Sequence, residues 1–241
     1  MEKKTNAGRN RIFIAISILA TVFIFSSCKK SGDDINTNPS SAALMAFNLA
    51  SDKGAIGFTI GGSRLNNSPL LYTNYTGYYQ AVFPGTREVS ALDFNSGTPF
   101  ATTSAVFDTN HYYSVFALGA NGNYKNLIVT DELDSLSAAT GKAFVRYINA
   151  IPDSSKPLVT LTAAGTDIAN SSTGYATISG FSGVNPGELT ISINNGAAIS
   201  ATRTITVEKA KVYTILLIGV PGATDPEKQV QIKFITNGKI S

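Results

Sequence analysis

The sequence predicts an all-β chain: two tandem immunoglobulin-like β-sandwich domains preceded by a signal peptide and a flexible tether. Three observations lead to this fold class. Short segments such as Leu189–Ile193 alternate apolar and polar residues, and Gly, Asn and Pro turns separate them. Three sequence landmarks recur at offsets of 100 to 102 residues. After Cys28, no amphipathic helix of useful length is recognisable.

Residues 1–27 have the composition of a lipoprotein signal peptide. Four basic residues precede the uncharged stretch Ile12–Phe25, which is followed by Ser26-Ser27-Cys28. The stretch is shorter than the about 20 apolar residues of a spanning helix. Cys28 is the single cysteine, so the chain cannot form an internal disulfide. We expect cleavage before Cys28 and its acylation, with palmitate among the chains, rather than an uncleaved anchor or a chance cysteine.

Residues 28–41 form the predicted lipidated tether, which is polar and rich in Ser and Asn. Its Asp33-Asp34 pair resembles the surface-export signal of Bacteroidetes lipoproteins, so we expect an outer-membrane anchor with the cell surface favoured over the periplasmic face. Removal of the signal peptide takes away four basic residues and one acid and leaves 15 of each. This neutral balance argues against a nucleic-acid partner.

The mature chain contains one pattern twice. The matched pairs are Ala43–Asp52 with Phe144–Asp153, Val82–Gly85 with Val184–Gly187, and Tyr113–Gly119 with Tyr213–Gly219. A period near 100 residues is too long for a solenoid unit and fits a duplicated domain. We expect β-sandwich domains over 42–130 and 142–241, with a linker over 131–141. The segments 113–118 and 213–218 are apolar on nearly every residue, which predicts central strands buried on both faces.

At these residues the chain resembles the domain of unknown function numbered 4397, a family common in bacterial surface and secreted proteins, Bacteroidetes lipoproteins included. The resemblance rests on Val145–Asp153, the Pro-Gly pair before a strand and the Tyr-Thr strand that ends at Gly219. It covers the mature chain from about Ala42 as two tandem copies and is better in the second. The resemblance implies a fold and carries over no catalytic residue.

Few residues are candidates for catalysis or metal binding. His111 is the single histidine and stands in a polar turn, and after Cys28 no thiol remains as a nucleophile. Asp131, Glu132 and Asp134 form the densest acidic cluster, which we interpret as a solvated linker, with a calcium site as the alternative. We therefore expect no cofactor, no metal and no enzymatic activity.

Two candidate ligand or modification sites remain. Tyr72, Tyr75, Tyr78 and Tyr79 could stack on sugar rings if they share one exposed face, or could instead pack between sheets. Asp134-Ser135-Leu136 matches a short O-glycosylation motif with Ser135 as acceptor. The sequence thus predicts a non-enzymatic, membrane-anchored surface lipoprotein that displays two sandwiches for adhesion, assembly or structural roles, with a protein or glycan partner. The alternative is a glycan-binding lipoprotein that assists polysaccharide capture.

Overall fold

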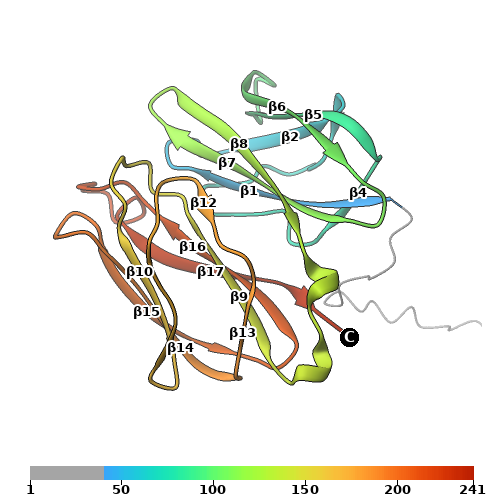
Figure 1. Cartoon of the computed structure of the whole chain (residues 1–241). Coiled ribbons are helices and arrows are strands. Elements are labelled where there is room, and N and C mark those ends of the chain that lie inside the picture. The colour runs from blue at the N-terminus through green and yellow to red at the C-terminus, as the bar shows by residue number, and fades with distance from the viewer. Residues whose placement is uncertain (1–40) are drawn as a thin grey trace, which may run out of the picture. The chain divides into compact units, whose positions relative to one another are not determined.

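The computed structural model of the chain describes residues 41–241, which belong to one compact unit. Cys28, the predicted signal peptide and all but the last residue of the predicted tether lie outside the described residues. Strands dominate residues 41–241, and the helices among them are single 3-10 turns, so the all-β prediction is confirmed (Figure 1). Within the same residues, no helix is long and apolar enough to cross a membrane.

The first sandwich consists of two four-stranded sheets. One sheet has the order β4-β1-β7-β8 and the other the order β3-β2-β5-β6. Strands β1 and β7 pair in parallel, whereas the other neighbours are antiparallel. The strands are β1 (Ala42–Ala50), β2 (Ile56–Ile60), β3 (Ser63–Arg64), β4 (Gln80–Val82), β5 (Gly85–Asp93), β6 (Pro99–Phe107), β7 (Tyr112–Ala120) and β8 (Asn123–Asp131).

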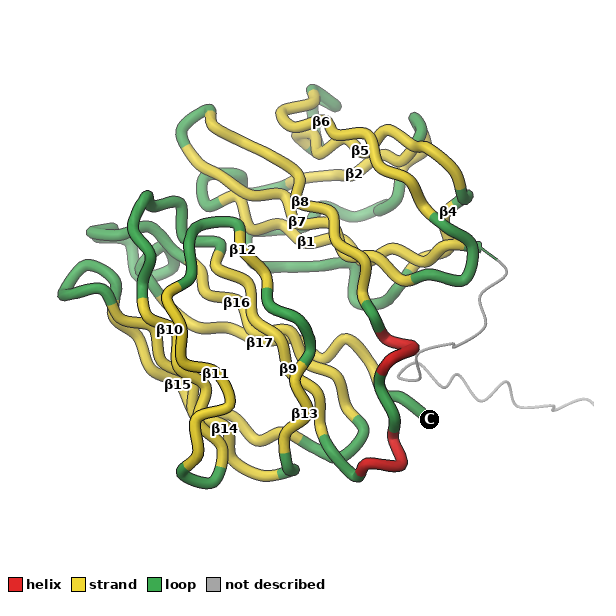
Figure 2. Tube along the Cα trace, viewed as in Figure 1, coloured by secondary structure: helices red, strands yellow, loops and turns green. Residues whose placement is uncertain are grey.

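The second sandwich repeats this arrangement. Its sheets have the orders β12-β9-β16-β17 and β11-β10-β14-β15, and β13 pairs with β9 as β4 pairs with β1. Strands β9 and β16 form the parallel pair. The strands are β9 (Ala143–Asn149), β10 (Leu158–Ala163), β11 (Thr166–Ser172), β12 (Thr177–Ile178), β13 (Ser182–Val184), β14 (Gly187–Asn194), β15 (Ser200–Val207), β16 (Lys211–Ile218) and β17 (Gln231–Lys239). The 3-10 helices η1 (Leu133–Ser135) and η2 (Ala138–Thr140) connect the two sandwiches (Figure 2).

The same tyrosine contact holds β7 in the first copy and β16 in the second. The backbone N–H of Asp108 donates to Tyr113 Oη at 2.8 Å, and that of Glu208 donates to Tyr213 Oη at 3.0 Å. A tyrosine that bonds back to the chain a few residues upstream is the tyrosine corner of immunoglobulin-like sandwiches. The repeated tyrosine in the sequence therefore marks a repeated corner.

The glycines at the ends of these strands are required by close backbone packing. Gly119 and Gly219 have φ values of 128° and 112°. A Cβ atom would come within 2.9 Å of the Tyr124 Cα at the first position and within 2.7 Å of the Val230 Cα at the second. Any other residue would clash with the neighbouring backbone, which explains why the landmark ends in Gly in both copies.

The sheets that contain β7 and β16 are buried on both faces. On β7, Val115 and Ala117 enter the core of the first sandwich, whereas Phe116 and Leu118 enter a different apolar cluster. That cluster joins β1 and β7 to β9 and β16, so the two sandwiches pack sheet against sheet; we call this contact the inter-sandwich interface. Its buried residues are Met45, Phe47, Leu49, Phe116, Leu118, Ile148, Ala150, Leu216, Ile218 and Ile235. The predicted two-sided burial is confirmed, and the second face of each strand is covered by the other sandwich.

Candidate functional site

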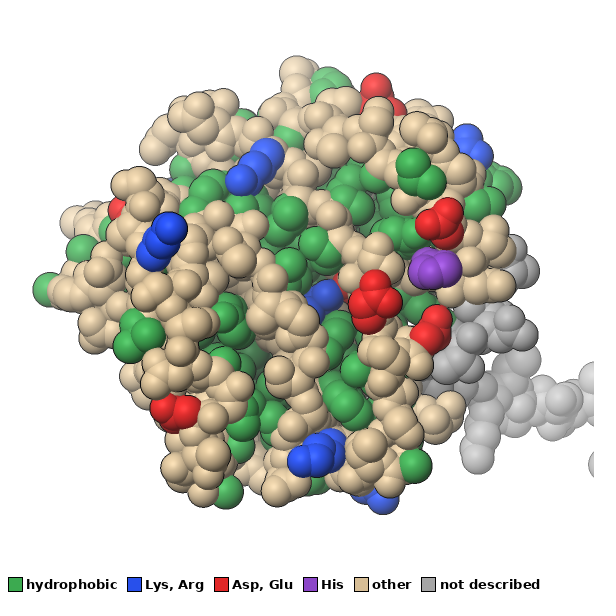
Figure 3. Space-filling model, in the orientation of Figure 1, with side chains coloured by type: hydrophobic (Ala, Val, Ile, Leu, Met, Phe, Trp, Pro, Cys, Tyr) green, Lys and Arg blue, Asp and Glu red, His purple; other side chains and the backbone are tan. Residues whose placement is uncertain are grey.

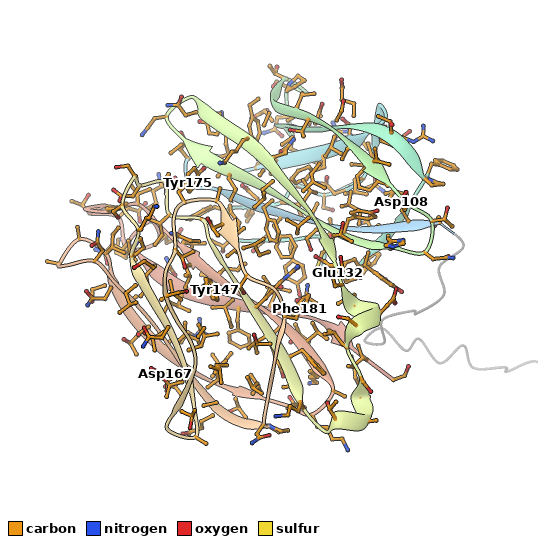
Figure 4. All side chains as sticks on the ribbon, viewed as in Figure 1. Asp108, Glu132, Tyr147, Asp167, Tyr175 and Phe181 are labelled. Carbon is orange, nitrogen blue, oxygen red and sulfur yellow. The ribbon has the colours of Figure 1, made fainter. Side chains whose placement is uncertain are left out.

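A buried ion pair crosses the inter-sandwich interface. Arg146, from the middle of β9, and Asp131, the last residue of β8, are each 3% exposed. Arg146 Nη1 lies 2.5 Å from Asp131 Oδ1, and Ser114 Oγ accepts from Arg146 Nη2 at 3.0 Å and donates to Asp131 Oδ2 at 2.6 Å. The guanidinium also lies 4.5 Å from the ring centre of Phe181, which is labelled in Figure 4. These contacts offset the desolvation of two charges that would otherwise be unfavourable in the interior.

The ion pair continues into a hydrogen-bonded network. Arg146 Nε donates to Thr214 Oγ1 at 3.0 Å, and Thr214 Oγ1 donates to Asn237 Oδ1 at 2.7 Å. Tyr79 Oη donates to Asp131 Oδ2 at 2.5 Å. Burial, and then the Asp131 carboxylate, raise the pKa of Tyr79 well above its ordinary value of 10.0. The Tyr79 phenol therefore keeps its proton, and the network links the two sandwiches by hydrogen bonds.

The four predicted sugar-contacting tyrosines do not share an exposed face. Tyr79 belongs to the buried network, and Tyr75 stacks on Phe47 in the inter-sandwich interface with 5.4 Å between ring centres. Tyr72 Oη accepts a backbone N–H of the second sandwich at 3.1 Å, and burial raises the pKa of Tyr72 to about 12. Tyr78 alone among the four is largely exposed, at 62%. The arrangement that would favour a tyrosine platform for sugars is therefore not present in residues 72–79.

The remaining predicted site residues lie apart from one another. Ser135 is exposed in η1, as an acceptor of a modification must be, and its Oγ donates to the Glu132 carbonyl at 2.6 Å. We expected Asp131 to lie in a solvated linker with Glu132 and Asp134; this is wrong for Asp131, which ends a strand and pairs with a buried arginine, whereas the other two are exposed. His111 is exposed in its turn. Within residues 41–241, no three His, Cys, Asp or Glu side chains are grouped to hold a metal ion.

A hollow of about 310 Å³ opens at one side of the first sandwich, between the edge strands of its two sheets. We call it the β3–β4 hollow. Its walls come from the β2–β3 hairpin, from β4 with the following Phe83, and from Arg87 on β5. Ile60, Leu65 and Val82 give it an apolar lining, and Arg87 gives it charge. Arg64 also borders the hollow, but its side chain lies on the outer face of the hairpin, because Arg64 pairs with the outward-facing Thr59. Its volume is at the lower end of the range of small-ligand pockets, about 300–1,000 Å³.

The two arginines of the β3–β4 hollow have no acidic partner. No lining residue is acidic, and the ion pairs within residues 41–241 involve neither arginine. Arg87 Nε and Nη2 donate to the Pro84 carbonyl at 3.2 and 2.9 Å, and its Nη1 makes no hydrogen bond with a described residue. The Arg64 guanidinium is directed away from the hollow: it lies 4.8 Å from the Phe94 ring centre, and its Nη2 donates to the Phe94 carbonyl at 3.5 Å. The hollow therefore presents the uncompensated positive charge of Arg87, with an N–H group still able to donate.

Comparison of the two copies explains why the hollow exists. Arg87 lies on the core-facing side of β5 and pairs with Ala105. The equivalent position of β14 is Leu189, which is fully buried in the second core. Strand β10 continues to a residue opposite Leu189, whereas β2 ends two residues short of Arg87. The first copy thus has an arginine and an open side where the second has a leucine and a closed core.

Sequence reasoning missed both arginines that matter here. Aligning the two copies by their Pro-Gly pairs places Arg87 on Leu189 and Phe83 on Asn185. A charged residue at a position that is apolar in the other copy was the available signal for the hollow. Similarly, Arg146 stands inside an otherwise apolar segment, which was the signal for a buried ion pair.

The face drawn in Figure 3 carries acidic side chains gathered near the histidine at the right of the view, whereas lysine and arginine side chains are spread among neutral ones. This face therefore gives no footprint for a polyanion.

The chain has weak similarity to two solved structures. A streptococcal family 41 carbohydrate-binding module, from work on α-glucan recognition by virulence factors, has 11% identity, a TM-score of 0.24, and coverage of 82% of this chain and 98% of that chain. A candidate cell adhesion protein from Bacteroides eggerthii DSM 20697 has 11% identity, a TM-score of 0.23, and coverage of 86% and 99%. These scores are too low to support an argument. No curated protein sequence matches the chain significantly.

A sequence profile gives the family. The profile described as "Domain of unknown function (DUF4397)" matches residues 42–156 and again residues 143–237. The first match covers the first sandwich and extends through β9, the second covers nearly all of the second sandwich, and together they span more than half of the chain. The chain therefore belongs to the DUF4397 family and carries two tandem copies of its domain.

Proposed function

We propose that the chain is a non-enzymatic lipoprotein of Bacteroidetes type, anchored in the outer membrane through Cys28. In this proposal it binds a partner at the cell surface, for adhesion or assembly, through the β3–β4 hollow. The proposal is supported by the difference between the copies: a charged, open hollow in one sandwich and a filled core at the same place in the other. Arg87, in a core-facing position, does not give the protein the apolar burial that Leu189 gives it. Such a loss of stabilising burial is typical of binding sites.

The inter-sandwich interface fits this role. Domains within a chain move relative to one another unless their interface is large and apolar. Here an apolar cluster surrounds the Arg146–Asp131 ion pair, so the second sandwich supports the first. Ala42, the first residue of β1, pairs with Val82 in the wall of the hollow.

A glycan-binding role in polysaccharide capture is the second candidate. It is favoured by Phe83, which is 80% exposed at the hollow and lies beside Arg87, with 6.0 Å between the guanidinium carbon and the ring centre. An exposed aromatic face is suited to stacking on a sugar ring, and the tyrosines that we first considered are largely used inside the protein.

Anchoring and binding are tested separately in cells. An acyl probe is expected to label the wild-type chain and not the Cys28→Ser variant; label that persists on the variant contradicts the anchor. Protease added to intact cells is expected to degrade the chain. Survival of the chain in intact cells, with degradation after lysis, would contradict surface display.

For binding, cells that display wild-type chain are compared with cells that display an Arg87→Leu/Phe83→Asn variant, which carries the second copy's residues. Attachment is measured on immobilised glycans and on immobilised matrix proteins, after the surface amounts are matched. We expect the wild type to attach to at least one of these surfaces and the variant to lose that attachment. Equal attachment of the two would remove the β3–β4 hollow from the function.

A further inference from the structure

We propose that the β3–β4 hollow binds a sugar ring that carries a carboxylate, as a unit of an acidic glycan. This inference rests on the proposed function, because it names the ligand class of the same site. It joins three features of the hollow: the guanidinium of Arg87 without an acidic partner, an exposed aromatic ring at the rim, and a small apolar lining.

The charge of the hollow selects an anion. A guanidinium presents a planar set of N–H donors that matches the two oxygens of a carboxylate. Arg87 is held by two hydrogen bonds to the Pro84 carbonyl, which fix its plane and leave Nη1 directed elsewhere. The Arg87 donor is therefore partly ordered before a ligand arrives, which lowers the entropic cost of binding.

The aromatic rim selects what is attached to the anion. The Phe83 ring is four-fifths exposed, although burying such a ring is favourable, and it lies beside the Arg87 guanidinium. A ligand that places its carboxylate on Arg87 would lay the adjoining group against Phe83. The apolar C–H face of a sugar ring fits that place, and its hydroxyls would face Ser63 and solvent. A bare phosphate would leave Phe83 and the apolar lining without contacts.

The strands around the hollow disfavour an extended acidic peptide. Peptides that bind to sheet edges form a row of main-chain hydrogen bonds along the edge strand. The edge strands here are β3, with 2 residues, and β4, with 3 residues. Such short edges offer little backbone for strand addition. The chemistry that remains is recognition of a compact ring with a carboxylate by side chains.

Calorimetric titration of the full chain in a neutral detergent tests this inference. The probes are oligogalacturonate, its methyl ester, inorganic phosphate and an oligoglutamate peptide. We expect oligogalacturonate to bind, and the methyl ester, which keeps the rings and lacks the charge, to bind on the order of tenfold more weakly or not at all. Phosphate and the peptide are expected to bind no better than the ester.

Three variants complete the titration. Arg87→Leu and Phe83→Asn are expected to fold, because the second copy has these residues at the equivalent positions, and each is expected to weaken oligogalacturonate binding on the order of tenfold. Lys209→Gln removes one positive charge from an exposed turn of the second sandwich and is expected to leave the affinity unchanged.

Several results would overturn the inference. These are no binding of oligogalacturonate, equal binding of the ester, unchanged affinity in Arg87→Leu, and phosphate or peptide binding as tight as that of the glycan. The last result would assign the hollow to anions in general or to acidic peptides. These titrations do not measure cell attachment. The proposed function is contradicted by a different result, namely cell attachment that does not depend on Arg87 and Phe83.

Discussion

Truncating the buried carboxylate of the inter-sandwich interface is expected to destabilise the protein strongly. In an Asp131→Ala variant, Arg146 stays 97% enclosed and loses its counter-ion, and Ser114 and Tyr79 lose their acceptor. Breaking one partner of a buried ion pair costs about 3–5 kcal/mol. At about 2–4 °C per kcal/mol for a chain of this size, the midpoint of thermal unfolding should fall by on the order of 10 °C.

Thermal and urea unfolding of the purified chain, followed by circular dichroism, measures this loss. Glu208→Gln is the matched control, because Glu208 pairs with Lys211 at the surface and its side chain is 61% exposed; its effect should stay within about 1 kcal/mol. The double variant Asp131→Leu/Arg146→Met should recover most of the stability, since it removes both charges together. A loss below about 1 kcal/mol in Asp131→Ala, or a double variant as unstable as the single one, would refute the reasoning.

Three further predictions follow from individual positions. Gly219→Ala should unfold at markedly lower urea concentration than wild type, whereas Gly54→Ala, with open space around its Cα, should be nearly neutral; equal effects would contradict the backbone clash. Because the folded-state pKa of Tyr79 is raised by burial, its contribution to stability should be constant below about pH 10 and be lost above it, and unfolding curves of Tyr79→Phe should show a smaller alkaline loss than wild type. Arg87→Leu should unfold at a temperature equal to or above that of wild type, since the second copy buries Leu189 at this position; a clear decrease would mean that Arg87 stabilises the fold.

The fold was predictable because its markers are local and occur twice. The Pro-Gly pair begins β5 and β14, and the Tyr and Gly landmarks bracket β7 and β16, where a corner hydrogen bond and a close backbone approach require them. Such constraints act through the chain's own backbone, so they are visible in one sequence. The apolar runs at β7 and β16 likewise indicated two-sided burial.

The partners of those buried faces could not be predicted in the same way. The apolar character of a residue such as Phe116 indicates that it is buried, but it does not indicate which sheet covers it. The packing of one sandwich on the other was therefore not predicted. For the same reason the tyrosines at 72–79 were compatible with either a surface platform or an interior contact, and the second use prevails for most of them. The hollow depends on where the β2–β3 hairpin turns, a two-residue difference between copies that no single segment reveals.

In our proposal, the first copy is the sandwich that binds the ligand and the second copy supports it. The most direct test is a two-dimensional NMR titration of the isotope-labelled chain with oligogalacturonate. We predict chemical-shift changes in residues 60–65 and 81–87, around the β3–β4 hollow, and unchanged signals for Asp167 and Leu189 in the equivalent region of the second copy. Changes centred on the second copy, or spread over both copies alike, would contradict the claim.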